Sequence, residues 1–143
     1  MSEKAHPTVT PMLATPDPDA AIAFYEAVFG AKRLPLQLKM QGALVHAEIE
    51  IGGTVLMLGA AGGPAPTADP LAGPKLNLMV EDADAVCAKA VAQGAETLIP
   101  VAEQFYGHRS GRIRDPFGYV WVLSQVVEDL SPAEIQARLD RMG

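Results

Sequence analysis

The stretch DPDAAIAFYEAVFGA, residues 17–31, occurs again in altered form as DADAVCAKAVAQGA, residues 82–95. In both copies an aspartate precedes a run of helix-forming residues and a glycine follows it. Aspartate caps helix N-termini, and glycine accepts the left-handed conformation that often ends a helix. Asp17 and Asp82 lie 65 residues apart, so the sequence predicts two related helices in two repeated halves.

Extended segments surround both predicted helices in the same order. Each helix is preceded by one such segment, which in the second half is 75–80. The three that follow each helix are 31–40, 43–51 and 54–59 in the first half, and 95–101, 108–114 and 119–125 in the second. We therefore expect an α+β fold of two tandem βαβββ modules. They are expected to form a curved, partly closed mixed sheet around a pocket, with the helices outside.

The predicted boundaries follow from the glycine and proline content. A single domain is expected over 1–143, with module one at 7–60, a linker at 61–74 and module two at 75–126. Ser131, Pro132 and Glu134 form a capping box, which predicts a C-terminal helix over 131–142. Its Ile135 and Leu139 make an apolar stripe.

Composition and charge exclude several classes of protein. The net charge of −6 disfavours nucleic acid as a partner. No apolar run approaches the roughly 20 residues of a membrane span, and the N-terminus does not read as a secretory signal, so no membrane partner is expected. Cys87 is the only cysteine, which excludes an intrachain disulfide and a cysteine-based zinc site. We expect a cytoplasmic protein.

Four segments together resemble the vicinal oxygen chelate superfamily, which includes glyoxalases, bleomycin-resistance proteins and dioxygenases. They are VTPMLATPDPDAAIAFYEAVFGA, HAEIEIGGTVLML, EQFYGHRSGRIRDPFGYVW and VEDLSPAEI, and the likeness is closest to the small bacterial glyoxalase-like subgroup. The resemblance covers nearly the whole chain and implies a pair of βαβββ modules. It leaves the activity open, because the superfamily contains lyases, dioxygenases, isomerases, thiol transferases and drug-binding proteins.

The glycines at 52 and 53 predict a two-residue hairpin turn and thereby the faces of the flanking strands. Ile51 would pair with Thr54, and Glu48 with Met57. Alternation then places Ala47, Ile49, Leu56 and Leu58 against a helix, and His46, Glu48, Glu50, Val55 and Met57 toward a cavity.

The strands of the second module also have a helix-facing and a cavity-facing side. Asn77 and Lys75 are expected on the cavity side of strand 75–80, and Val122 on that side of strand 119–125. Asp115–Gly118 is a type I-like turn similar to a signature turn of the superfamily. A regular four-residue hairpin would put Arg112 opposite Trp121 under the helix, where an unpaired charge is costly. We therefore favour a bulge near the turn, which directs Arg112 to the cavity or to solvent.

The resemblance also implies four positions for metal ligands, a histidine in the first strand of each module and a carboxylate in the last. These positions fall on Thr10, Met57, Lys75 and Val122. None is a ligand of the expected kind, and the lysine opposes a divalent cation. We expect no divalent metal at these positions and no cofactor. One alternative metal site remains open, formed by His46, Glu48 and His108 with the ligand types that suit zinc or iron.

Aromatic and cationic residues before strand 108–114 suggest a rim for the pocket. Phe105 and Tyr106 beside Arg109 can stack on a planar ligand. The alternative is that the rings complete the core while Arg109 pairs with an acid. The candidate ligand-binding residues are Thr10, His46, Glu48, Met57, Lys75, Asn77, Phe105, Tyr106, Arg109, Arg112 and Val122.

Two functions from different classes fit this pattern. The first is a metal-free binding protein of the bleomycin-resistance kind, with an amphipathic or cationic small molecule as its partner. The second is a glyoxalase-like lyase or related enzyme acting on a small oxygenated or thiol-adduct substrate, with Glu48 as general base and Lys75 or an arginine stabilising the developing negative charge. A purely structural dimerisation module fits less well, because the inward face is not fully apolar. In each case we expect a homodimer.

Overall fold

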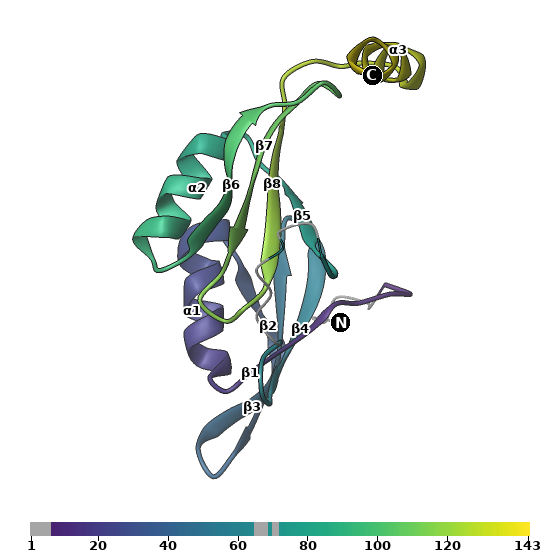
Figure 1. Cartoon of the computed structure of the whole chain (residues 1–143). Coiled ribbons are helices and arrows are strands. Elements are labelled where there is room, and N and C mark those ends of the chain that lie inside the picture. The colour runs from purple at the N-terminus through teal and green to yellow at the C-terminus, as the bar shows by residue number, and fades with distance from the viewer. Residues whose placement is uncertain (1–6, 65–68, 70–71) are drawn as a thin grey trace. The chain divides into compact units, whose positions relative to one another are not determined.

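The computed structural model describes residues 7–64, 69 and 72–143. Its contacts divide the chain into two compact units (Figure 1). Unit 1 comprises the chain up to Pro66 together with Pro116–Gly118, and unit 2 comprises Thr67–Asp115 and Tyr119–Gly143.

Unit 1 contains one helix and four strands in the predicted order. They are β1 (Met12–Thr15), α1 (Pro18–Phe29), β2 (Lys32–Met40), β3 (Ala43–Ile51) and β4 (Thr54–Ala60). The sheet order is β1-β4-β3-β2, with β1 parallel to β4 and the other pairs antiparallel.

Helix α1 begins and ends where the sequence predicts. The Asp17 side chain accepts a hydrogen bond from the Ala20 main-chain nitrogen at 3.1 Å, and Gly30 ends the helix at a φ of 70°. The helix packs on β1, β3 and β4 through a buried side that includes Ile22 and Tyr25. Phe117 joins this core, with its ring centroid 6.3 Å from that of Tyr25.

The β3–β4 hairpin confirms the predicted register. Ile51 pairs with Thr54 and Glu48 with Met57, and Gly52 and Gly53 have φ values of 53° and 87°. Glycine adopts such angles without the steric cost that a Cβ brings. The predicted helix-facing side chains are all buried, namely Ala47, Ile49, Leu56 and Leu58.

Unit 2 repeats the arrangement and adds a C-terminal helix. Its elements are β5 (Leu76–Met79), α2 (Ala83–Ala92), β6 (Glu96–Glu103), β7 (His108–Arg114), β8 (Val120–Val126) and α3 (Pro132–Met142). The sheet order is β5-β8-β7-β6, again with the first pair parallel.

The register shows how close the repeat is. Met12 pairs with Met57 in unit 1, and Asn77 pairs with Val122 in unit 2. The fold class is therefore confirmed as α+β, with two βαβββ modules, two four-stranded mixed sheets and helices packed on the sheets. Neither sheet is closed into a barrel.

The connection between β7 and β8 explains the direction of Arg112. The ladder is regular from Arg114 and Val120 onward, and Arg112 pairs with Val122 rather than with Trp121. The Asp115 main-chain N–H donates to the Tyr119 carbonyl at 2.8 Å, so only Pro116–Gly118 stay outside the ladder, and Gly118 closes this loop at a φ of 98°. A three-residue loop that ends in a left-handed glycine contains a bulge, as expected, and it turns Arg112 away from Trp121. The Asp115 side chain supports this turn, because it accepts the Tyr119 main-chain N–H at 3.0 Å.

The edge strands β2 and β6 share an irregularity. Each contains a proline, Pro35 or Pro100, and each shows two register shifts against its neighbour. Proline cannot donate a main-chain hydrogen bond and is therefore found mainly on edge strands or at bulges. Both features protect these edges from pairing with another strand.

Helix α3 carries the predicted capping box. The Ser131 hydroxyl accepts from the Glu134 main-chain nitrogen, while the Glu134 carboxylate accepts from that of Ser131. Arg138 then joins the helix to the rest of unit 2 through Glu128, with N–O distances of 2.8 and 2.7 Å. Among the described residues, no helix is long and apolar enough to cross a membrane.

Candidate functional site

In unit 1, the sheet face opposite α1 carries the predicted carboxylate. Met12, Met57 and Glu48 form a row across β1, β4 and β3. The Glu48 residue is only 6% exposed, and its main-chain oxygen accepts a hydrogen bond from Gln37 at 3.0 Å. A carboxylate therefore lies beside two thioethers on this face.

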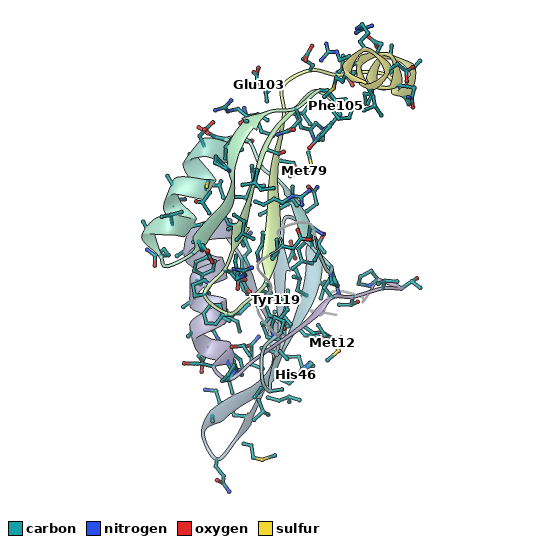
Figure 2. All side chains as sticks on the ribbon, viewed as in Figure 1. Met12, His46, Met79, Glu103, Phe105 and Tyr119 are labelled. Atoms are coloured by element: carbon teal, nitrogen blue, oxygen red, sulfur yellow. The ribbon has the colours of Figure 1, made fainter. Side chains whose placement is uncertain are left out.

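His46 lies on the same face, one row further along the strands. It pairs with Gly59 of β4, which has no side chain. A Cβ placed at Gly59 would meet no atom within 4 Å, so the space above this glycine is open. Figure 2 shows His46 and Met12, two labelled side chains of unit 1. No side chain of Gly59 therefore covers His46 on this face.

In unit 2, the corresponding row is Asn77, Val122 and Arg112. The Ser124 hydroxyl donates a hydrogen bond to Asn77 Oδ1 at 2.7 Å. The Asn77 amide nitrogen is 3.3 Å from Met79 Sδ, a weak acceptor, and Asn77 itself is exposed. This row therefore presents an amide donor and a guanidinium, in contrast to the carboxylate row of unit 1.

The two aromatic residues predicted for the rim, Phe105 and Tyr106, lie just before β7. The Phe105 and Tyr106 rings meet edge to face at 5.2 Å, and the rings of Tyr106 and His108 at 5.1 Å. The Tyr106 hydroxyl is 3.3 Å from that of Ser110, which is buried. All three rings are half-buried, so part of each remains available to a ligand.

Arg109 lies apart from this group. Its guanidinium contacts both oxygens of Asp84 at the start of α2, at 2.6 and 3.0 Å. The hydrogen bond from Arg109 lowers the pKa of the Asp84 carboxyl below its usual value. Strand alternation puts Arg109 on the opposite sheet face from Ser110 and Arg112. The geometry therefore favours the alternative in which Arg109 pairs with an acid.

Thr10 and Lys75 both lie just before the first strand of their unit. Thr10 precedes β1 by two residues, and its hydroxyl donates to the Pro7 carbonyl at 3.3 Å. Lys75 immediately precedes β5, and its ammonium group donates to the Gly73 carbonyl at 2.7 Å. Thr10 and Lys75 thus occupy corresponding positions in the two units. This agrees with the 65-residue repeat from which the four metal-ligand positions were inferred.

The side chains at those four positions do not fit the divalent metal that the resemblance implies. Thr10, Met57, Lys75 and Val122 supply a hydroxyl, a thioether, an ammonium and an alkyl group. Divalent zinc, nickel, manganese and iron prefer imidazole and carboxylate ligands.

The alternative metal site divides between the units. In the described part of the chain, no three His, Cys, Asp or Glu side chains gather as a metal-binding group. His46 and Glu48 belong to unit 1 and His108 to unit 2, so each unit holds only part of this set.

Some contributors to these faces were not among our predicted site residues. Met12 was missed because the predicted strands of module one gave no boundary for β1. Ser110 and Ser124 pair with each other and are themselves buried, and each lies two residues from Arg112 or Val122 on the same strand, which was the available signal. Sequence does not reveal their hydrogen bonds. Ser124 bonds Asn77, which lies far away in the sequence, and the Ser110 bond depends on where the Tyr106 ring lies.

Known proteins similar to this chain include one protein superfamily and two mycobacterial relatives. The model of the Glyoxalase/Bleomycin resistance protein/Dioxygenase superfamily matches residues 6–123. The uncharacterised protein Mb0911c of Mycobacterium bovis is 33% identical over 150 aligned positions, covering 100% of this chain and 99% of the relative. The uncharacterised protein Rv0887c of Mycobacterium tuberculosis is also 33% identical, covering 100% of this chain and 88% of the relative.

Solved structures show the same fold. TioX from Micromonospora sp. ML1 is 25% identical with a TM-score of 0.64, covering 87% of this chain and 100% of its own. The fosfomycin resistance protein FosX from Listeria monocytogenes is 15% identical with a TM-score of 0.68, and the match covers 92% of this chain and 99% of FosX. At that identity the second likeness concerns the fold alone.

Proposed function

Because the chain belongs to the glyoxalase/bleomycin resistance protein/dioxygenase superfamily, we propose that it is a small-molecule-binding protein that works without the superfamily's usual metal site. The observation that carries this proposal is the donor set at the four ligand positions, Thr10, Met57, Lys75 and Val122. Without metal ligands there, binding has to come from the hydrogen-bonding and apolar groups on the two sheet faces.

The chemistry of the faces supports an amphipathic ligand. The unit 1 face offers carboxylate oxygens at Glu48 and Glu50 beside the thioethers of Met12 and Met57, which suits a cationic group with an apolar neighbour. The unit 2 face offers hydrogen-bond donors and aromatic rings, which suit a planar group that carries acceptors. Ligand pockets commonly combine mostly apolar walls with a few such polar groups.

A second candidate is the glyoxalase-like lyase or related enzyme. It is favoured by one observation, the buried carboxylate of Glu48 on the sheet face away from α1. In this proposal Glu48 acts as the general base that removes a proton from a small oxygenated or thiol-adduct substrate.

The binding proposal is tested with 8-anilinonaphthalene-1-sulfonate, whose rings and sulfonate match the unit 2 face. Arg112→Gln removes the cationic donor and is expected to weaken binding about tenfold, the effect of losing one charged hydrogen bond worth about 1.4 kcal/mol. Lys39→Gln, an exposed cation of unit 1, is the control and should leave the dissociation constant unchanged. Fluorescence titration gives both constants, and equal weakening by the two variants would contradict the proposed face.

The enzyme candidate has a separate readout. The adduct of glutathione and methylglyoxal serves as the probe, and its conversion is followed by absorbance. Turnover that is lost in Glu48→Gln while the melting temperature is retained would establish the lyase and overturn the pure binding protein. No turnover in the parent protein would exclude that reaction.

We also propose that the protein is cytoplasmic and forms a homodimer. The single cysteine suits a reducing compartment. The proposed dimer draws support from apolar surface on unit 2 that one chain leaves exposed, at Val91, Leu139 and Met142.

A further inference from the structure

An open apolar groove of about 620 Å³ runs along unit 2 between α2 and the edge strand β6. Its lining residues are Asp84, Cys87, Ala88, Val91, Ala92, Thr97, Pro100 and Val101. This groove is distinct from the sheet face that carries Asn77 and Arg112, because α2 packs on the other side of that sheet. It is therefore a second candidate binding surface.

The groove exists because α2 is apolar on more sides than its sheet covers. Ala83 and Ala90 are buried against the sheet. Ala88, Val91 and Ala92 are apolar as well, yet all three are exposed, with Val91 46% exposed. Covering the exposed apolar side of such a helix with another apolar surface lowers the free energy of the system.

Helix α3 has the matching property. None of its residues is buried, and Ile135, Leu139 and Met142 follow one another at helical spacing. Leu139 is 45% and Met142 67% exposed. The helix presents an apolar ridge that its own chain leaves largely uncovered.

The two surfaces do not meet within one chain. Arg138 donates to the Glu128 carboxylate and, at 3.3 Å, to the Phe105 carbonyl, which holds α3 near the start of β7. Figure 1 shows α3 beyond that end of the strands, whereas α2 lies along the side of the same sheet. In Figure 2, Phe105 marks the end of the strands nearest to α3.

We propose that α3 of one copy docks in the α2–β6 groove of a second copy. The groove and the ridge have similar lengths. At 1.5 Å per residue, α2 spans about 12 Å from Asp84 to Ala92, and α3 spans about 10 Å from Ile135 to Met142. Exchange of α3 in both directions around a twofold axis buries the pair of surfaces twice, which favours a closed dimer.

Charge complementarity sets the direction of docking. Asp82, Asp84 and Glu103 surround Arg109 at the N-terminal end of α2, which leaves this end net negative. Arg141 lies in the last turn of α3 and Glu134 in its first, while Lys89 lies in the last turn of α2. Antiparallel helices bring Glu134 toward Lys89 and opposite helix-dipole ends together. They also bring Arg141 to the acidic end, where the charge of Asp140 in the same turn offsets part of its effect.

The test measures the mass of the full chain in solution by sedimentation equilibrium. Val91→Glu places a charge in the groove and Leu139→Glu places one on the ridge, and each is expected to raise the dimer dissociation constant at least tenfold. Met40→Glu is the matched control, because this residue is apolar and exposed but lies in unit 1. Melting curves of all three variants show whether the monomer remains folded.

The cysteine gives a direct test of contact. Cys87 is the only cysteine and lines the groove, so Leu139→Cys provides one partner on the ridge. Mild oxidation is expected to give a disulfide-linked dimer on a non-reducing gel. The linkage should be lost when Cys87→Ser is added and should not form in Lys39→Cys.

Each other outcome overturns the proposal. A monomeric parent chain at all concentrations excludes the second copy as occupant. A dimer that Val91→Glu and Leu139→Glu leave intact assembles through another surface. A disulfide within a single chain means that α3 folds back into its own groove. Ligand binding to the Arg112 face is measured separately, so failure here is distinguishable from failure of the proposed function.

Discussion

Replacement of Asp115 by alanine is expected to lower the free energy of unfolding by about 3 kcal/mol, the largest effect of any single change considered. The side chain is buried, at 3% exposure. One carboxylate oxygen accepts the Trp121 indole N–H at 2.9 Å, and the other accepts the Tyr119 main-chain N–H at 3.0 Å. Alanine leaves both donors without this acceptor, and the indole donor is buried.

Thermal and urea denaturation measure this effect. A loss of 3 kcal/mol corresponds to a fall in melting temperature of about 10 °C for a chain of this size. Asp129→Ala, an exposed aspartate of unit 2, is the control and should change stability by less than about 0.5 kcal/mol. In a Trp121→Phe background, which lacks the indole donor, Asp115→Ala should cost less. Equal melting temperatures for parent and Asp115→Ala would contradict the role assigned to this turn.

Gly111→Ala is expected to destabilise unit 2 by about 2 kcal/mol through overpacking. Gly111 lies in β7 between Ser110 and Arg112, whose β6 partners are Ala102 and Ile99, so two residues of β6 face this single glycine. A Cβ here would lie 2.8 Å from Val101 Cγ2, 2.9 Å from the Val101 nitrogen and 3.0 Å from the Ile99 oxygen. Two of these atoms belong to the backbone, so β6 itself must move.

Gly59→Ala is the matched control for this change. Gly59 lies in β4, also has no positive φ, and a Cβ there meets nothing within 4 Å. Alanine at this position should leave stability unchanged or raise it by up to about 1 kcal/mol, because it restricts the unfolded chain. If both variants denature at the same urea concentration, the close approach of β6 to Gly111 is wrong.

The features predicted correctly from the sequence are those with local causes. Asp17 and Asp82 cap their helices, and the glycines at 52 and 53 close a two-residue turn. A two-residue turn fixes which residues pair, so the faces of β3 and β4 followed directly from it. Because the second half of the sequence repeats the first, the same topology was predicted for unit 2.

The β7–β8 connection shows where local reasoning ends. A turn signal at Asp115–Gly118 does not determine how many residues separate the paired ends of the strands. In the structure Asp115 pairs with Tyr119 through its main-chain N–H, and the Asp115 carboxylate accepts the Tyr119 main-chain N–H as well. The direction of Arg112 was predicted correctly, because the cost of an unpaired charge under the helix favoured the bulge that Gly118 forms.

The surroundings of Arg109 and the α2–β6 groove depend on tertiary packing. Asp84 lies 25 residues before Arg109 in the chain, and no short-range pattern connects them. The apolar residues of α2 indicate a buried helix, but the sequence does not show which of them the sheet covers. Both features arise from how α2 lies on its sheet.

Elemental analysis of the protein purified without added metal tests the central claim most directly, namely that this member of the superfamily binds its ligand without the usual metal. The donor set of Thr10, Met57, Lys75 and Val122 predicts well under one equivalent of zinc, nickel, manganese or iron per chain, and a melting temperature that a chelator leaves unchanged. Stoichiometric metal that stays bound through chelation would contradict the account.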